Sequence, residues 1–159
     1  MSNEFRAGDA SVSQHRFAVI VSQYNTRITT SLHDAALATL KENDIPEENI
    51  DVVWVPGAWE IPLMARKFLE SNNRVSAVVC LGCVIRGVTT HDQHINREVS
   101  QSLSQLGHEF GKPVAMGVLT CNTVKQAEAR AGGNRGNKGV EATQAAIDML
   151  RLIDLLKSQ

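Results

Sequence analysis

Apolar residues along this chain form two kinds of pattern, continuous runs and stretches in which they recur every three or four positions. Four valine-rich runs lie at residues 16–22, 50–55, 77–85 and 113–120. Such runs are typical of strands that are buried on both faces of a parallel sheet. The run at 50–55 alternates apolar and polar side chains more than the others do, which predicts a strand nearer the edge of the sheet.

Stretches with helical spacing follow the runs and predict helices with one apolar face each. These faces comprise Leu32, Ala35, Ala36 and Leu40; Ile61, Met64, Ala65, Phe68 and Leu69; Ile95, Val99, Leu103 and Leu106; and Val140, Ala146, Met149, Leu150, Ile153 and Leu156. We expect Thr29 or Thr30 to cap the first helix, and residues 111–113 to end the third. A short helix at 123–130, a glycine-rich loop at 131–139 and the last helix complete the chain.

The order strand, helix, strand, helix, repeated four times, predicts a parallel sheet with right-handed crossovers and helices on both faces. Residues 16–159 are expected to form this single domain, and residues 1–15, which have few apolar anchors, to form a flexible N-terminal segment. In sheets of this kind ligands bind at the carboxyl ends of the strands. The sequence therefore directs the search for a site to the residues that follow each run.

Composition narrows the class of protein. The formal net charge of -1 gives no electrostatic reason to expect a nucleic-acid partner. The longest apolar run has nine residues, well short of the roughly 20 that span a bilayer, and residues 1–14 are polar and unlike a signal peptide. We therefore expect no membrane partner and a cytoplasmic location.

The three cysteines, Cys80, Cys83 and Cys121, do not suggest a disulfide framework, because their number is odd. The Cys80-x-x-Cys83 spacing is found in redox and zinc sites. Here, however, both residues lie inside a predicted strand, where positions i and i+3 point to opposite faces. The spacing therefore favours core packing.

The most informative stretch is 81–91, where a strand ends, a glycine follows and a helix begins. Thr89 or Thr90 can cap that helix, and free backbone N–H groups at a helix start beside a positive charge bind phosphate well. Arg86 provides such a charge, although a strand-end arginine could equally pair with a carboxylate. His91 falls in the first helical turn, which makes it the best-placed group for proton transfer next to a bound anion.

Other candidate residues follow the remaining strands. Tyr24 and Trp59 are aromatic residues at strand ends, where a ring can stack on a heterocycle, and core packing is the alternative. His91, His94 and Glu98 share helical spacing, which allows two interpretations, a metal site or a partly buried His94 at the rim of a pocket. Without distant ligands in evidence, we predict no metal site.

Five blocks together resemble the 6,7-dimethyl-8-ribityllumazine synthase family in order and spacing. They are Tyr24-Asn25 and residues 55–62 (VPGAWEIP), 82–91 (GCVIRGVTTH), 117–120 (GVLT) and 130–139 (RAGGNRGNKG). The resemblance runs from about residue 17 to 156. It implies a flavodoxin-like three-layer α/β/α sandwich with a four-stranded parallel sheet. It also implies a transferase of riboflavin biosynthesis that needs no metal and no organic cofactor.

The reaction implied by the resemblance joins 5-amino-6-ribitylamino-2,4(1H,3H)-pyrimidinedione to 3,4-dihydroxy-2-butanone 4-phosphate and releases phosphate and water. His91 matches the family's proton-transfer residue. The implied substrate-binding residues are Tyr24, Asn25, Ala58, Trp59, Glu60, Val84, Ile85, Met116 and Lys138, and the implied phosphate-binding residues are Gly87, Val88, Thr89, Thr90 and Arg130. Met116 stands where the family usually has a phenylalanine that closes the pocket from the adjacent subunit.

One segment departs from the family pattern. Where the family reads aromatic, acid, aromatic after the histidine, this chain has Asp92, Gln93 and His94. We hypothesise that Asp92 orients His91, because a carboxylate partner raises imidazole basicity. The departure also keeps two alternatives open, a paralogue that binds flavin or lumazine with little catalysis and a metal-dependent lyase.

The resemblance further implies a homopentamer with the pocket between neighbouring subunits. Strictly pentameric members often carry extra residues near the glycine-rich loop, and residues 130–139 show no such insertion, which favours an icosahedral assembly of 60 subunits. Association with riboflavin synthase is a further expectation of the resemblance.

Overall fold

The computed structural model describes residues 2–71 and 74–159. Met1, the first residue of the predicted flexible segment, lies outside the described residues. The elements follow the chain in the order β1 (Phe17–Ser22), α1 (Thr26–Glu42), η1 (Glu47–Asn49), β2 (Ile50–Val55), η2 (Ala58–Glu60), α2 (Ile61–Glu70), β3 (Ala77–Ile85), α3 (His91–Phe110), β4 (Val114–Cys121), α4 (Val124–Arg130), β5 (Ala131–Gly133), β6 (Gly136–Asn137) and α5 (Lys138–Lys157), where η marks a 3₁₀ turn.

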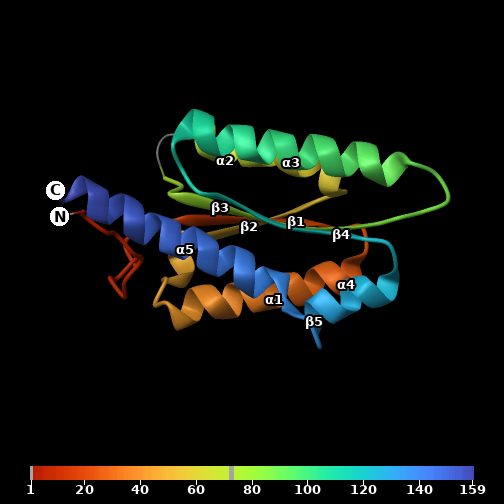
Figure 1. The fold of residues 1–159 in the computed structure, drawn as a ribbon, viewed down its shortest axis with the longest axis horizontal. Coiled ribbons are helices and arrows are strands. Elements are labelled where there is room, and N and C mark those ends of the chain that lie inside the picture. Colours follow the sequence, from red (N-terminus) through yellow and green to blue (C-terminus); the bar gives the residue numbers. More distant parts are fainter. Residues whose placement is uncertain (1, 72–73) are drawn as a thin grey trace.

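The four long strands form one parallel sheet in the order β2-β1-β3-β4. Helices α2 and α3 cover one face, and α1, α4 and α5 cover the other (Figure 1). The predicted three-layer α/β/α, flavodoxin-like architecture is therefore confirmed, as is the edge position of β2. The carboxyl ends of all four strands lie at one edge of the sheet, where a ligand site is expected.

Two apolar clusters fill the space between the sheet and its helices. Cys80 belongs to the cluster under α2 and α3, and Cys83 belongs to the cluster on the opposite face. Both are free and buried, and burial raises the pKa of the Cys83 thiol to about 12 and that of Cys80 still further. The prediction that the pair packs in the core on opposite faces is confirmed.

Helix α1 begins at Thr26, so the prediction that Thr29 or Thr30 caps it is wrong. The residue at the N-cap is Asn25, in the left-handed conformation with φ 61°. Thr29 is fully buried inside the helix, where its hydroxyl donates to the Thr26 carbonyl rather than capping a free N–H. Asparagine tolerates this conformation better than most residues, which allows the helix to start directly after Tyr24.

The glycine-rich segment is more ordered than the predicted loop. It forms a short antiparallel hairpin of β5 and β6, in which Gly132 and Gly136 adopt positive φ values of 106° and 77°. The Arg135 backbone N–H donates to the Ala129 carbonyl at 2.8 Å, which folds the hairpin back onto the end of α4.

Helix α5 does not bury all six of the residues assigned to its inner face. Val140, Met149 and Leu156 are 42% to 58% exposed, which contradicts the prediction for these three. Gly139 lies directly against α1, and Ala142, Ala146 and Leu150 are buried in the apolar cluster on this side of the sheet. A Cβ on Gly139 would lie 2.1 Å from the Leu32 carbonyl oxygen, so α1 and α5 approach too closely there for a larger side chain. The three exposed apolar side chains lie at different positions around the helix, with Val140 about 180° from Met149.

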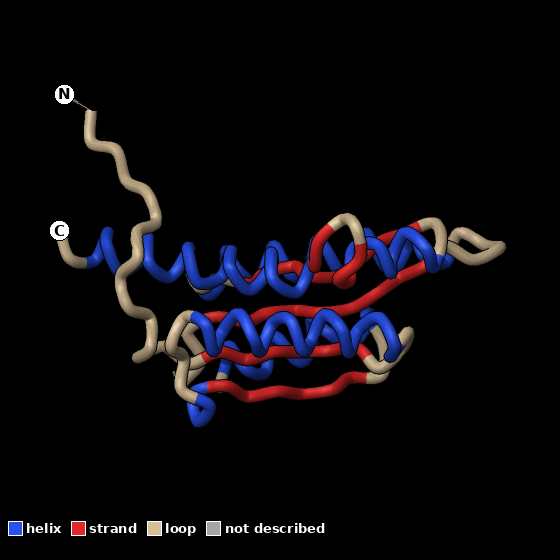
Figure 2. Tube along the Cα trace, turned by 90° about the horizontal axis from the view of Figure 1, so that it is seen from below, coloured by secondary structure: helices blue, strands red, loops and turns tan. Residues whose placement is uncertain are grey.

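The second half of the N-terminal segment contacts the body of the domain. Val12 is fully buried, and the His15 ring bonds Ser76 Oγ at 2.9 Å and Asp154 Oδ2 at 2.6 Å. The Arg151 guanidinium also donates to the Ala10 carbonyl. Figure 2 shows this segment passing the C-terminal end of α5 as an extended loop. Polarity alone did not reveal this anchoring, and the flexibility of residues 1–15 stays a prediction.

Within the described residues, no helix combines the length and the apolar character that crossing a membrane requires.

Candidate active site

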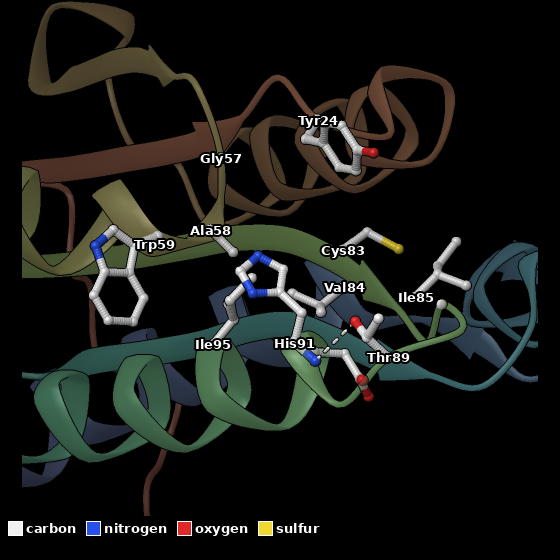
Figure 3. A pocket seen from close by; sticks show the side chains of 12 residues that line it. Tyr24, Gly57, Ala58, Trp59, Cys83, Val84, Ile85, Thr89, His91 and Ile95 are labelled. Carbon is white, nitrogen blue, oxygen red and sulfur yellow. Dashed lines mark hydrogen bonds between the residues drawn. The ribbon is translucent and has the colours of Figure 1, made fainter.

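The main pocket, about 480 Å³ in volume, opens where β1, β2 and β3 end (Figure 3). Its lining comprises Tyr24, Gly57, Ala58, Trp59, Cys83, Val84, Ile85, Gly87, Thr89, His91, Asp92 and Ile95. Eight of the fifteen residues predicted for the site are in this set. They come from three separate segments of the chain, so the fold brings together the motifs that the sequence placed at strand ends.

Two aromatic rings line the pocket on different elements. Tyr24 follows β1 and Trp59 lies in the 3₁₀ turn after β2, and they are 74% and 55% exposed. Rings this exposed are not core residues, so the core-packing alternative for both is wrong. Each leaves a flat apolar surface uncovered at the mouth of the pocket, as a stacking role requires.

Asn25 and Glu60 hold these aromatic segments in place and do not line the pocket. The Asn25 side-chain amide donates to the Cys83 carbonyl at 2.9 Å. The Glu60 carboxylate accepts from the Gly57 backbone N–H, also at 2.9 Å. In this structure both predicted binding residues therefore have supporting contacts within the chain.

The turn between β3 and α3 contributes Gly87 and Thr89 to the pocket, whereas Val88 and Thr90 are exposed outside it. The His91 backbone N–H donates to Thr89 Oγ1 at 3.4 Å, a long bond that leaves this N–H available to a ligand. Arg86 is exposed, and none of the described carboxylates pairs with it. The alternative that Arg86 pairs with a carboxylate is therefore not observed among the described residues of one chain.

His91 begins α3, and its ring projects into the pocket beside Ala58 (Figure 3). Asp92 lines the same pocket, but among the described contacts no hydrogen bond joins it to His91. The buried Oδ1 atom of Asp92 has no hydrogen-bond partner within the described chain, and the same is true of Asn96 Oδ1. A buried acceptor without a donor is unfavourable, so this corner of the pocket is suited to a donor from a ligand, a water molecule or another chain.

His94 is exposed and does not line the pocket, so the prediction that it lies partly buried at the rim is wrong. Although His94 lies three residues after His91 on α3, its side chain is exposed to solvent, whereas His91, Asp92 and Ile95 line the pocket. No three or more His, Cys, Asp or Glu residues of 2–71 and 74–159 are arranged to hold a metal ion.

A second, smaller cleft of about 250 Å³ lies beyond the end of β4. It is lined by Val118, Leu119, Thr120, Cys121, Arg130, Arg135, Lys138 and Glu141. Lys138 Nζ pairs with Glu141 at 2.9 Å, and the Arg130 guanidinium donates to the Gln126 carbonyl at 3.1 Å. Burial raises the pKa of Cys121 above its ordinary value, while the nearby Arg130 charge acts in the opposite direction.

Within one chain, the predicted site residues are therefore divided. His91 and the aromatic rings line the main pocket, whereas Arg130 and Lys138 line the cleft, and Met116, 37% exposed, lines neither. Sequence reasoning placed Asp92 at the site only as a partner of His91, and it missed Arg135 in the cleft. The signal for Arg135 was a cation in the same glycine-rich segment as Lys138.

A parallel α/β/α sheet with a pocket at its carboxyl edge, lined by exposed aromatic rings and a histidine, is typical of an enzyme that binds a small ligand there. Comparison with known proteins specifies the class further. The profile of the 6,7-dimethyl-8-ribityllumazine synthase family matches residues 14–154, and the chain belongs to this family.

Two similar proteins are both named 6,7-dimethyl-8-ribityllumazine synthase. The one from Stenotrophomonas maltophilia (strain K279a) is 45% identical over 141 residues, which cover 89% of this chain and 90% of that protein. The one from Rhodopirellula baltica (strain DSM 10527 / NCIMB 13988 / SH1) is 47% identical over 137 residues, which cover 86% and 88%. The predicted family, the transferase class and the lumazine-forming reaction of riboflavin biosynthesis are confirmed, and neither comparison favours a non-catalytic paralogue.

Proposed function

We propose that the lumazine-forming condensation takes place in the pocket of Tyr24, Trp59 and His91, completed by Arg130 and Lys138 of a neighbouring copy of the chain. The observation that carries this proposal is the division of the site, because the acid–base residue and the cationic cleft line separate cavities within one chain. A reaction that moves a proton and expels phosphate needs both groups at one ligand.

The pyrimidine substrate is proposed to stack on the exposed rings. Aromatic stacking adds about 0.5–1.5 kcal/mol beyond the burial of area. The backbone of Val84 and Ile85, at the end of β3, is proposed to bond the edge of the pyrimidine. Glu60 is proposed to accept from ribityl hydroxyls with the carboxylate oxygen that does not bond Gly57. Met116 is proposed to close the pocket from the adjacent subunit, with Ala58 forming part of its wall.

His91 is proposed to transfer protons. Attack of the pyrimidine amine on the ketone gives a carbinolamine, and loss of water gives an imine. Removal of a proton from the adjacent carbon then allows the carbon–oxygen bond to the phosphate to break, and phosphate leaves. An imidazole beside the leaving group can accept that proton near neutral pH.

The phosphate is proposed to lie between Arg130 and the turn of Gly87 to Thr90. The N-terminus of α3 provides unsatisfied backbone N–H groups and a positive dipole end. The planar guanidinium of Arg130 can donate two parallel hydrogen bonds to phosphate oxygens, whereas a lysine acts as a point charge. Lys138 lines the same cleft, where it is paired with Glu141.

The assembly is proposed to be a homopentamer, and the absence of an insertion in residues 130–139 favours a 60-subunit shell built from pentamers. The uncovered apolar side chains of Val140, Met149 and Leu156 on α5 support an interface with further copies. Light scattering that gives the mass of five chains would reject the shell. Association with riboflavin synthase and a cytoplasmic location remain predictions.

The test of the proposed function is turnover of both substrates by the purified chain, followed through product fluorescence. We expect the wild-type protein to form the lumazine and His91→Asn to lose about 10²-fold in kcat or more. His108→Asn is the matched control, because His108 is exposed near the other end of the same helix. Binding of product by the wild-type chain without turnover would instead support the flavin- or lumazine-binding paralogue.

Asp92 is proposed to set the basicity or orientation of His91 once a ligand fills the pocket. In the ligand-free chain its Oδ1 atom has no partner among the described residues. Asp92→Asn removes the charge at nearly constant size and should change the pH dependence of kcat. An unchanged pH–rate profile would remove this role.

A further inference from the structure

We infer that Arg135 is a second guanidinium of the phosphate site, binding the phosphate ester beside Arg130 and setting the enzyme's affinity for that substrate. This inference rests on the proposed function, because it assumes that the cleft of Arg130 receives the phosphate. The family resemblance assigned no role to residue 135, and the inference comes from the position of this residue in the structure.

The hairpin places Arg135 and Arg130 at the same cleft although they lie on different elements. Arg130 is the last residue of α4, and Arg135 lies in the turn between β5 and β6. The bond from the Arg135 backbone N–H to the Ala129 carbonyl holds that turn against the end of α4. Because this bond uses only the backbone, it fixes the position of residue 135 and leaves its side chain free to bind a ligand.

The charges of the cleft are not balanced within the chain. Lys138 and Glu141 neutralise each other as an ion pair, whereas Arg130 and Arg135 pair with no carboxylate among the described residues. Two unpaired guanidinium groups remain, a charge of about +2. A phosphate monoester carries about −1.5 to −2 near pH 7, because its second pKa is close to 6. The cleft therefore matches a phosphate dianion in charge.

The geometry also favours phosphate over a single carboxylate. Each guanidinium can donate two parallel hydrogen bonds, and a phosphate has three terminal oxygens to accept them. Apolar side chains of Val118 and Leu119 form part of the cleft, and apolar walls strengthen charge interactions by reducing the access of water.

A nearby arginine provides the contrast. Arg27 lines a different cavity beside the same hairpin and pairs with Glu128 at 3.4 Å. Arg27 and Arg135 are both exposed, but Arg27 lies outside the cleft, so Arg27→Ala controls for a general loss of positive charge from this surface.

The experiment compares Arg135→Ala, Arg135→Lys and Arg27→Ala in steady-state turnover. We expect Arg135→Ala to raise KM for the phosphate ester about tenfold, the lower end of the effect of losing a charge-assisted hydrogen bond. KM for the pyrimidine and kcat should change less than about twofold. Inhibition by inorganic phosphate should weaken in parallel with KM for the ester, Arg135→Lys should restore part of both, and Arg27→Ala should match the wild type.

Arg130→Gln separates this inference from the proposed function. If Arg130→Gln impairs turnover while Arg135→Ala leaves KM for the ester and phosphate inhibition unchanged, the role of Arg135 is rejected and the proposed site stands. The same rejection follows if Arg135→Ala and Arg27→Ala have equal effects. If Arg130→Gln is also fully active, the proposed site itself is wrong.

Discussion

The side-chain amide of Asn25 donates a hydrogen bond of 2.9 Å to the backbone carbonyl of Cys83, one strand away in the sheet. The ladder between β1 and β3 ends at the pair Val21 and Leu81, so this amide takes over where strand pairing stops. Asn25 also holds the left-handed conformation that starts α1 directly after Tyr24. One residue therefore connects the Tyr24 turn to the wall of the pocket.

Replacing Asn25 should weaken both the fold and the pocket. Asn25→Gly tolerates the positive φ but loses the amide bond, and leaving a buried carbonyl unpaired costs about 1–3 kcal/mol. Asn25→Ala adds about 1–2 kcal/mol of backbone strain. Urea denaturation should show the wild type as the most stable protein, Asn25→Gly as less stable and Asn25→Ala as the least stable. Asp44→Ala, at the other non-glycine position with positive φ (58°), controls for strain alone. Equal stability of wild type and Asn25→Gly would show that the bond contributes nothing.

Gly139 is required by the close approach of α5 to α1. An added Cβ would lie 2.1 Å from the Leu32 carbonyl oxygen and 2.9 Å from its carbonyl carbon, and backbone cannot move aside as a flexible side chain can. Gly139→Ala should destabilise the fold by about 3 kcal/mol, the upper part of the usual range for overpacking, and displace the adjacent Lys138. Thermal and urea unfolding measure the loss of stability, and KM reports the displacement of Lys138.

The matched control for Gly139 is Gly107, in the interior of α3. A Cβ there would lie 3.5 Å from its nearest neighbour, an ordinary contact. Gly107→Ala should therefore be neutral or stabilising by up to about 1 kcal/mol, since alanine is the better helix former. If both alanine variants behave alike, the packing argument for Gly139 fails.

Trp59 should report the filling of the pocket. Its ring is 55% exposed there, whereas Trp54, the other tryptophan, lies on β2 with its ring centroid 5.3 Å from that of His33. In a Trp54→Phe background, binding of the pyrimidine substrate should shift tryptophan emission to shorter wavelength, because the indole loses contact with water. In the Trp59→Phe variant, which keeps Trp54, binding of the pyrimidine should no longer shift the tryptophan emission. A full binding signal from Trp59→Phe would place the ligand elsewhere.

The buried thiols predict a loss of stability at high pH. Burial raises the pKa of Cys83 to about 12 and also raises that of Cys80, while an unfolded thiol ionises near 8.5. Unfolding therefore releases protons above that pH, so the contribution of the neutral thiols is complete below about pH 8.5 and is lost as pH rises toward 12. The urea concentration at the unfolding midpoint should decrease as the pH is raised from 8 to 10.5.

The control for this pH effect is the double variant Cys80→Ala, Cys83→Ala. It will be less stable at every pH because two side chains are truncated, but its midpoint should fall less steeply with pH than that of the wild type. Parallel curves would show that the cysteines do not cause the alkaline loss.

Local sequence patterns predicted most of the fold and part of the lining of the main pocket. The continuous apolar runs predicted all four long strands, and the rule that ligands bind at strand ends directed attention to Tyr24, Trp59 and His91, which line the pocket at that edge. These features depend on periodicity and on short-range geometry. The exposed apolar residues of α5 could not be predicted in this way, because the packing of this helix depends on its close approach to α1 at Gly139, a contact between distant parts of the chain.

Two other features could not be predicted for the same reason. The bond from Asn25 to Cys83 depends on where the strand ladder ends, and the substrate-binding role of Asn25 stays a prediction. Arg135 was overlooked because its position at the cleft depends on a hairpin folded against α4. His94 was misjudged for a similar reason, because helical spacing makes it a neighbour of His91 and its exposure depends on which side of α3 packs against the sheet. The resemblance implied a pocket between subunits, and the structure adds that Arg130 and Lys138 line a cleft separate from the pocket of His91 within one chain.

The central claim is that one subunit provides His91 and its neighbour provides Arg130. Coexpression of two separately inactive variants, His91→Ala and Arg130→Ala, in one assembly tests this most directly. If each site joins His91 of one copy to Arg130 of the next around a closed ring, random mixing of equal amounts leaves about one quarter of the sites intact. We predict recovery of about a quarter of wild-type activity. Mixed assemblies that remain as inactive as either variant alone would contradict the account, because both residues would then have to come from the same chain.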